Sequence, residues 1–332
     1  MSVALTRSRL SNALRCYIGY ALNRLGSAFP FLHPTPYTIH HLPLFVSVEP
    51  ASICQLRCPA CPVGNLNLEV SKSRNHDKFI SREVWARTLA ETAKHAWVVQ
   101  FYFQGEPLLN KDLPHMIQEA HEAGLYTIVS TNAQAMTPQM AQALVQAGLD
   151  RIIISMDGLT QETYNAYRVG GDIGKCKDAL RWLSEAKNQN STIVIELQCL
   201  RLRTNEQEWR QFKREYKALG ADRLAFKTAQ LYDYTNGHPL MPSNPRYSRY
   251  VQGKDGKYQR RPLRKGCFRV WSGVVVTTNG DVLPCCYDKA HTHAYGNIMS
   301  APLTDLFANK KAMSFRQAAF NEQPAICKEC WR

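Results

Sequence analysis

Acidic residues are scarce in this sequence. Its 332 residues include 27 Asp and Glu against 41 Lys and Arg, which gives a formal net charge of +14. A field of this sign favours anionic partners, namely phosphorylated or carboxylated small molecules, nucleic acid or an anionic membrane surface, without choosing among them. Because the positive residues are spread along the chain, a solvated basic surface is the simpler interpretation, and we expect no nucleic-acid partner.

Long apolar segments are also missing. Arginines at positions 7, 9, 15 and 24 interrupt the N-terminal region, and no apolar core with a small-residue cleavage site follows, so no signal peptide is predicted. Residues 25–48 have no Lys, Arg, Asp or Glu, but four prolines and three histidines argue against a membrane-spanning helix there. We therefore expect a cytoplasmic protein.

Cysteine, by contrast, is abundant, with 11 residues. They do not have the spacing of a secreted disulfide scaffold, because seven fall into two groups spaced like metal ligands and four are scattered, at 16, 176, 199 and 286. Metal-cluster binding in a reducing compartment explains this pattern better than disulfide bonds do.

The first cysteine group is Cys54, Cys58 and Cys61, which follows an apolar, β-branched run at 44–48 that predicts a buried strand. A structural zinc site needs four protein ligands, and an ordinary electron-transfer [4Fe–4S] cluster needs four cysteines. Three thiolates with C-x3-C-x2-C spacing would leave one iron of a cluster open for a small molecule. An incomplete zinc knuckle and merely buried thiols are the simpler alternatives.

This triplet resembles the signature of radical S-adenosylmethionine (SAM) enzymes. In that family the open iron binds the amino and carboxylate groups of SAM, and reductive cleavage of SAM yields a 5′-deoxyadenosyl radical. The resemblance implies a SAM-binding [4Fe–4S] cluster, SAM itself, and a reductant such as flavodoxin or ferredoxin. Ala60 departs from the pattern, because many members have an aromatic residue there that lies against the adenine.

Strands and helices alternate after the triplet. Further strands are predicted at 97–103, 125–130, 151–155, 192–197 and 223–226, with helical stretches between and after them. Six strand-plus-helix units predict an α/β fold with a parallel sheet. With the resemblance, we expect a partial (β/α)6 TIM-like barrel and a small C-terminal β-hairpin/helix iron–sulfur domain. We place an N-terminal amphipathic helix and Pro-rich connector at 1–43, the barrel at 44–240 and the C-terminal domain at 241–332.

Ligands of such folds bind at the carboxyl ends of the strands. Three strand ends carry segments that resemble the family's SAM-binding motifs: the Gly-Gly-Glu motif after the second strand, the Thr-Asn pair after the third and a Ser-x-Asp-Gly segment after the fourth. The resemblance implies that SAM contacts come from Gln104, Gly105, Glu106, Asn132, Ser155, Asp157 and Arg168.

Each of these residues has a structural alternative. Ser155 and Asp157 would also suit helix caps, and Asn132 would suit a turn. Arg168, a candidate partner for the SAM carboxylate because its guanidinium is planar, would also suit a structural ion pair.

The second cysteine group lies in the C-terminal region. Cys267 precedes a predicted strand at 271–277 and a hairpin turn at 278–281, Cys285 follows the hairpin, and Cys327 and Cys330 form a C-x2-C knuckle. Four thiolates also suit zinc. The arrangement resembles the SPASM/twitch extension of radical SAM enzymes, which implies an auxiliary [4Fe–4S] cluster on these four residues, in the single-cluster form. Cys286 is an alternative to Cys285.

The resemblance leaves two substrate classes open. Family members with auxiliary clusters oxidise carbohydrate or cyclitol alcohols, or modify peptide and protein side chains. The single auxiliary set favours the first class, so the leading hypothesis is hydrogen abstraction from, and oxidation of, a small polar, sugar-like or cyclitol substrate. A SPASM-type peptide or protein side-chain maturase is the alternative, and a non-catalytic metal-cluster binding protein is a third hypothesis.

No catalytic base is identified by the sequence. Tyr102, Glu196 and Lys227 fall near the presumed cavity, where barrel packing or salt bridging explains them equally well. The densest basic run, 254–269, is either an exposed loop or a surface that captures an acidic or phosphorylated substrate.

Residues 3–25 have the periodicity of an amphipathic helix, with Arg7, Arg15 and Arg24 on or near its polar face. Such a helix either docks on the enzyme body or lies on an anionic membrane surface as a peripheral contact. Docking is preferred, because Tyr and Gly dilute the lipid-facing character. The apolar positions are Leu10, Leu14, Tyr17, Ile18, Ala21, Leu22 and Leu25.

Overall fold

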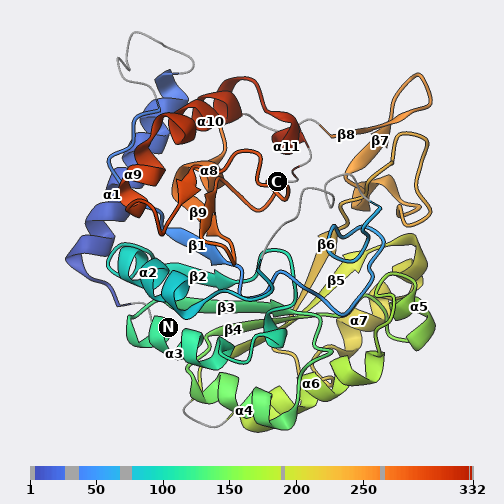
Figure 1. Cartoon of the computed structure of the whole chain (residues 1–332). Coiled ribbons are helices and arrows are strands. Elements are labelled where there is room, and N and C mark those ends of the chain that lie inside the picture. The colour runs from blue at the N-terminus through green and yellow to red at the C-terminus, as the bar shows by residue number, and fades with distance from the viewer. Residues whose placement is uncertain are drawn as a thin grey trace.

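The computed structural model describes residues 4–26, 37–67, 77–187, 191–261, 266–328 and 330 (Figure 1). Its centre is a nine-stranded sheet with the strand order β11-β10-β9-β1-β2-β3-β4-β5-β6. Neighbours from β1 to β6 are parallel, which confirms the partial (β/α)6 barrel. These strands are β1 (Phe45–Val48), β2 (Val98–Phe101), β3 (Tyr126–Thr131), β4 (Arg151–Ser155), β5 (Val194–Arg201) and β6 (Arg223–Thr228).

Helices cover the outer face of this sheet (Figure 1). They begin where polar side chains cap them, as sequence patterns predict: Ser81 accepts a hydrogen bond from the backbone N–H of Val84, and Thr137 accepts one from Met140. The helices are α2 (Arg82–Thr92), α3 (Leu113–Glu122), α4 (Pro138–Gln146), α5 (Gln161–Asn165), α6 (Ile173–Ala186) and α7 (Trp209–Glu215), with 3-10 helices η3 (Pro107–Leu109) and η4 (Arg203–Glu208).

The two faces of the sheet differ in polarity. Val46, Val48 and Phe101 point outward and belong to the main hydrophobic core under the helices. Alternate side chains point into the barrel, where Ser47 on β1 donates to the Gln100 amide oxygen on β2 at 3.1 Å. The barrel interior therefore offers polar groups to a ligand, while the outer face supplies stability.

The C-terminal hairpin extends the barrel sheet directly. β9 (Gly273–Val276) pairs in parallel with β1, and β10 (Asp281–Leu283) and β11 (Gly296–Asn297) follow antiparallel. The predicted strand at 271–277 is partly wrong, because Phe268–Ser272 form the short helix α8 before β9 begins. The turn is one residue longer than predicted: the Thr277 N–H donates to the Asp281 carbonyl at 3.1 Å, and Gly280 has φ +84°.

The remaining C-terminal elements are helical. Two helices follow one another here, because Asn309 ends the first and caps the second. These helices are α9 (Leu303–Ala308), α10 (Lys310–Asn321) and α11 (Ala325–Lys328).

The region between the barrel and the second cysteine group has structure of its own. It contains the 3-10 helix η5 (Pro245–Tyr247) and a hairpin of β7 (Tyr250–Gln252) and β8 (Tyr258–Arg260). Within the basic run, Arg264 and Lys265 lie outside the described residues. The domain boundaries near 43 and 240 stay predictions.

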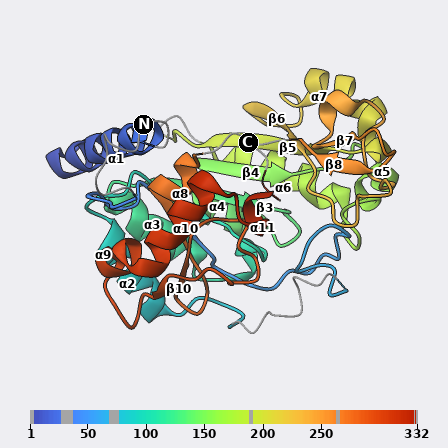
Figure 2. The same ribbon diagram turned by 90° about the horizontal axis from the view of Figure 1, so that it is seen from above.

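The N-terminal helix α1 (Arg7–Gly26) docks on the body, along one edge of the molecule in both views (Figures 1 and 2). On its docked side Arg9, Asn12 and Asn23 are buried together with Cys16, whereas most of its large apolar side chains are exposed. Among the residues that the structure describes, no helix is long and apolar enough to cross a membrane.

Candidate active site and cluster sites

The first cysteine group lies just past the end of β1, at the carboxyl edge of the parallel sheet. The Cys54 thiol accepts hydrogen bonds from the Leu56 backbone N–H and from the Asn132 side chain, each at 3.4 Å. Polar N–H groups aimed at sulfur stabilise cluster-bound thiolates. Asn132 therefore lies beside the cysteine loop, as its place after the third strand predicted.

The three thiols are close neighbours. Burial raises the pKa of Cys54 to about 12, with further contributions from the nearby Glu106, Cys61 and Cys58. Burial also raises the pKa of Cys58, next to Cys61. Three thiolates this close together repel one another unless a cation lies between them, and the irons of a cluster supply that positive charge. The donor set thus fits a cluster held by Cys54, Cys58 and Cys61.

A single-metal site fits less well. All the described cysteines are free thiols, and within the described part of the chain no three Cys, His, Asp or Glu side chains are gathered so as to hold one metal ion. A tetrahedral zinc ion needs its ligands packed around one point, whereas the thiolates of a [4Fe–4S] cluster bind different irons and stand further apart. At the first group the sequence itself favours a cluster, because it supplies three thiolates rather than the four ligands of a structural zinc site.

Gly105 and Glu106 fix the ends of the strands around this loop. A Cβ on Gly105 would lie 2.2 Å from the Ala51 carbonyl oxygen, so the approach to the cysteine loop has room only for glycine. Glu106 is buried and accepts hydrogen bonds from the Thr131 hydroxyl at 2.5 Å and the Asn132 N–H at 2.8 Å. Its carboxylate thereby joins the ends of β2 and β3.

Gln104 follows β2, and Ser155 ends β4. The Gln104 amide donates to the Lys289 carbonyl at 3.0 Å, which ties the end of β2 to the C-terminal region. Ser155 is buried at the end of β4, paired with Gln198 of β5.

Asp157 and Arg168 form the ion pair that the sequence left open as an alternative. The Arg168 Nε donates to Asp157 at 2.6 Å, and the other Asp157 oxygen accepts from the Leu200 N–H at 2.6 Å. Arg168 also hydrogen-bonds the Cys58 thiol, and it lowers the pKa of that thiol against the larger effect of burial. The Asp157–Arg168 ion pair therefore lies beside the cysteine loop and contacts it through Arg168.

The second cysteine group gathers beside β9 and β10. Burial raises the pKa of Cys285, and Cys286, Cys327 and Cys330 are near enough to raise it further. Cys267 caps α8 and accepts from the Val270 N–H at 3.4 Å. Because Cys285 lies near both knuckle thiols, it suits the ligand role.

Arginines surround this second group. The Arg260 guanidinium donates to the Cys330 carbonyl at 2.9 Å, and Arg269 donates to the Cys286 thiol at 3.4 Å. Arg249 lies near Cys330 as well and lowers the pKa of that thiol, although burial raises it more. Cations here stabilise the negative charge of a thiolate-bound cluster.

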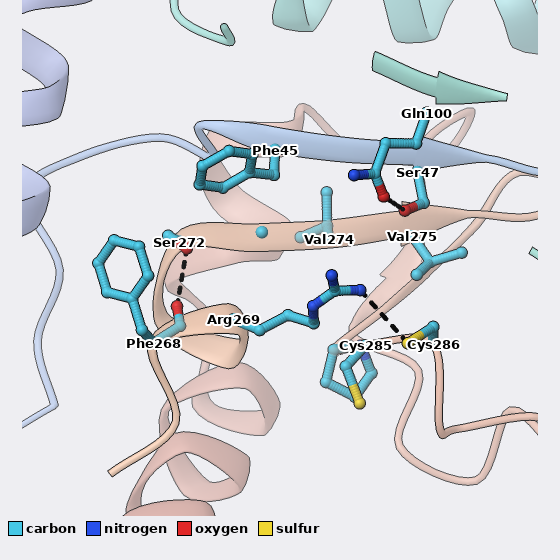
Figure 3. Close-up of a pocket in the computed structure, with 12 residues that line it drawn as sticks. Phe45, Ser47, Gln100, Phe268, Arg269, Ser272, Val274, Val275, Cys285 and Cys286 are labelled. Atoms are coloured by element: carbon cyan, nitrogen blue, oxygen red, sulfur yellow. Dashed lines mark hydrogen bonds between the residues drawn. The ribbon is translucent and has the colours of Figure 1, made fainter. Parts of the chain in front are cut away.

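A cavity of about 230 Å³ joins the barrel to this region. Ser47 and Gln100 line it from β1 and β2, and Val275, Cys285 and Cys286 line it from the C-terminal hairpin. Arg269 reaches across it from α8 (Figure 3). Among the described residues Arg269 forms no ion pair with a carboxylate, and its guanidinium donates to the Cys286 thiol on the cavity wall.

The other sequence candidates near the cavity have different surroundings. Glu196 forms an ion pair with Arg151 across β4 and β5. Lys227 is exposed on the edge strand β6. Burial raises the pKa of Tyr102, which has Arg269 and Cys286 near it.

Two residues gain importance only from the structure. A Cβ on Gly64 would lie 2.6 Å from the Cys58 backbone nitrogen, so the cysteine loop folds back on this glycine. Its place three residues after Cys61 was a usable signal in the sequence. Arg269 had no such signal, because it was one of seven basic residues in the run 254–269.

Comparison with known proteins agrees with this geometry. The model of the radical SAM superfamily matches residues 48–197, and that of the SPASM iron–sulfur cluster-binding domain matches residues 267–331. A PqqA peptide cyclase from Rhodopseudomonas palustris is 33% identical over 208 residues, which cover 61% of this chain and only 52% of that relative. A PqqA peptide cyclase from Ruegeria pomeroyi is 28% identical over 320 residues, 87% of this chain and 80% of the relative.

The fold is shared with solved structures as well. Streptococcus suis SuiB bound to precursor peptide SuiA superposes with a TM-score of 0.64 at 14% identity, over 92% of this chain and 74% of SuiB. Such a likeness concerns the fold alone. With both domain models matched, the cofactors are a SAM-binding [4Fe–4S] cluster, an auxiliary iron–sulfur cluster and SAM. The chain is an enzyme of the radical SAM superfamily with a C-terminal SPASM domain.

Proposed function

We propose that this enzyme cleaves SAM reductively and modifies a side chain of a peptide substrate. The observation that carries the proposal is the similarity to PqqA peptide cyclases, which extends over 87% of this chain in the Ruegeria pomeroyi relative. It favours the maturase alternative over the small sugar-like or cyclitol substrate that the resemblance had placed first.

The cysteine loop would hold the SAM-binding cluster through Cys54, Cys58 and Cys61. When bound, cluster and SAM supply the 5′-deoxyadenosyl radical, which is strong enough to take hydrogen from an unactivated carbon. Asn132 donates to Cys54, and Arg168 donates to Cys58, so both act as positioning residues for the loop.

The strand ends would hold SAM itself. Ser155, Asn132 and the backbone around Gly105 stand at the carboxyl edge of the sheet, where ligands of this fold bind. Glu106 and Asp157 have both carboxylate oxygens engaged by protein donors, so they would act by fixing the backbone around SAM. This assignment refines the sequence prediction of direct contacts for these two acids.

The substrate would lie in the cavity between the barrel and the C-terminal hairpin. The buried Val274 and Val275 make part of its wall apolar, and exclusion of water would protect a radical intermediate from side reactions. Arg269 would bind a carboxylate, because a guanidinium forms paired charge-assisted hydrogen bonds with that group. The peptide would then carry an acidic side chain close to the reacting carbon.

Isotope transfer tests the substrate class. The reconstituted enzyme, reduced with dithionite, is incubated with SAM and with deuterated synthetic peptides that contain Asp or Glu, and in parallel with deuterated sugars and cyclitols. We expect deuterium in 5′-deoxyadenosine, and a mass change of the product, from a peptide. Transfer of deuterium from a sugar or cyclitol, and from none of the peptides, would contradict the proposal and favour a small sugar-like or cyclitol substrate.

Arg269→Gln tests the position of the acidic group. We expect the KM for such a peptide to rise by about tenfold or more, since a charge-assisted hydrogen bond contributes about 1.5–3 kcal/mol. Because Arg269 also donates to the Cys286 thiol, iron per chain is measured for the variant, so that loss of the auxiliary cluster is distinguished from loss of peptide binding. Arg246→Gln, at an exposed position on η5, is the matched control.

A further inference from the structure

Helix α1 has its apolar side turned toward solvent. Six large apolar side chains on one side of it are between 46% and 61% exposed: Leu10, Leu14, Tyr17, Ile18, Leu22 and Leu25. A surface helix of a soluble protein ordinarily buries this side. A contiguous exposed apolar face marks an interaction surface rather than scattered surface residues.

Buried polar contacts fix the helix in this orientation. The Arg9 guanidinium is almost fully buried and donates to four carbonyls, those of Ala4, Ala93, Ala123 and Gly124, at 2.6–2.8 Å. Rotating α1 to bury its leucines would break the three of these hydrogen bonds that join it to Ala93, Ala123 and Gly124 of the enzyme body. The outward apolar face is therefore built into the fold.

Further contacts hold the middle and the end of the helix. The Asn12 side chain is joined to the Leu42 backbone by hydrogen bonds of 2.8 and 3.1 Å. The Trp271 indole N–H donates to the Cys16 carbonyl at 2.9 Å, and Asn23 accepts from the Tyr37 N–H at 2.7 Å. Polar contacts therefore occur along the docked side from Arg9 to Asn23, and in its middle Cys16 adds an apolar contact in a cluster with Trp271 and Phe320.

The charges around the apolar face are all positive. Arg7–Gly26 contains no Asp or Glu. With about 100° per residue, Arg15 and Arg24 lie roughly 80–100° to either side of the midline of the apolar face. Arginines in these places can extend to lipid phosphates while their methylenes remain on apolar surface. The net charge of +14 adds attraction to an anionic surface.

A groove runs along one flank of the same helix. It has a volume of about 370 Å³ and is lined on the α1 side by Ser8, Ser11 and Arg15, and opposite by His40 and His95. These side chains offer hydroxyl, imidazole and guanidinium groups, which are donors for a phosphate. The groove lies next to the apolar face. A phospholipid could therefore place its phosphate in the groove and its acyl chains against the apolar face.

We propose that α1 binds the surface of a bilayer that contains anionic phospholipids, with its apolar face inserted and its arginines at the phosphates. The helix would lie in the interface without spanning the membrane, as amphipathic helices with basic flanks do. The proposal does not depend on the proposed reaction, although α1 contacts the chain next to Cys267, where the Tyr20 hydroxyl donates to the Gly266 carbonyl at 2.8 Å.

Vesicle sedimentation tests the proposal on the full-length enzyme. Sucrose-loaded vesicles of phosphatidylcholine alone and of phosphatidylcholine with phosphatidylglycerol are compared at low and high salt. We expect binding to the mixed vesicles, weaker binding to phosphatidylcholine alone, and a decrease with added salt. The double variant Leu14→Glu/Ile18→Glu should lower the partition coefficient by about tenfold or more.

Two further variants separate charge from fold. Arg15→Gln/Arg24→Gln should weaken binding about 5- to 25-fold on the mixed vesicles only, since each cation contributes about 1 kcal/mol at an anionic surface. Met299→Glu, at an exposed apolar position away from α1, should bind like the wild type. Unchanged circular dichroism and cluster absorbance confirm that each variant is folded.

The proposal fails if the wild type sediments with neither vesicle, or if the Leu14→Glu/Ile18→Glu variant sediments as well as the wild type. It also fails if sedimentation velocity shows concentration-dependent self-association that this variant abolishes while vesicle binding is absent. In that case the face is an interface between copies of the chain.

Discussion

Arg9 controls how α1 attaches to the enzyme. Its guanidinium donates to Ala93 and Ala123, which are the C-caps of α2 and α3, as well as to Gly124 and Ala4. The C-terminus of a helix carries about half a negative charge, so two of them together match one guanidinium without any carboxylate. Arg9→Met keeps most of the side-chain volume but removes the charge and all four hydrogen bonds.

The expected cost follows from these contacts. A hydrogen bond to a charged group contributes about 1.5–3 kcal/mol, but four bonds to one desolvated group are not additive. We therefore expect Arg9→Met to destabilise the docked helix by about 3 kcal/mol. That free energy corresponds to roughly a hundredfold increase in the local opening equilibrium.

Hydrogen–deuterium exchange measures this opening. Amides of Arg7–Gly26 should exchange roughly a hundredfold faster in Arg9→Met, while amides of β1–β4 should keep their protection. Arg7→Met is the matched control, because Arg7 is exposed on the same helix. If exchange in α1 changes by less than about threefold in Arg9→Met, the buried guanidinium does not hold the helix and our account of its orientation is wrong.

Three further predictions concern the cluster sites and the core. Gly105→Ala should reduce iron incorporation into the first site and abolish SAM cleavage, because its Cβ would lie 2.2 Å from the Ala51 carbonyl oxygen; normal iron content would refute this. Cys285→Ser should lose the auxiliary cluster, measured as iron per chain, whereas Cys286→Ser should keep it; the reverse result would make Cys286 the ligand. Burial lowers the pKa of His41 from its ordinary value of 6.5 to about 4 in the folded protein. Below pH 6.5 the unfolded chain therefore binds more protons at His41 than the folded chain does. Unfolding free energy should therefore fall by about 1 kcal/mol from pH 7.5 to 5.5, and urea titrations of His41→Gln should show a flatter profile.

The order and type of the elements could be predicted from the sequence. Apolar periodicity and caps such as Ser81 and Thr137 are local properties, so the strands and helices of the barrel were found within a few residues of their bounds. The cysteine groups were equally accessible, because a ligand spacing such as 54, 58 and 61 is a property of one short loop.

Side-chain partners could not be predicted in this way. Arg168 suited either SAM or an ion pair from the sequence, and the fold decided by placing Asp157 2.6 Å from its Nε. Arg269 was one cation among many until β9 paired with β1 and placed it in a cavity between two domains. The pairing of β9 with β1 joins segments more than 200 residues apart, and the pairing of Arg168 with Asp157 depends on how the chain turns over the 11 residues between them. Neither outcome is recorded by a local sequence pattern.

The orientation of α1 is the clearest case. The sequence predicted an amphipathic helix over residues 3–25, because its apolar residues recur with helical spacing, and α1 spans Arg7–Gly26. It did not determine which side would face the protein. That was decided by the tertiary structure, since the ends of α2 and α3 bring carbonyls from residues 93, 123 and 124 to one point, where a buried guanidinium satisfies them. The last carbonyls of a helix have no donor within that helix, and Arg9 supplies donors to those of α2 and α3. The side of α1 that carries Arg9 is therefore docked, and its apolar side is exposed.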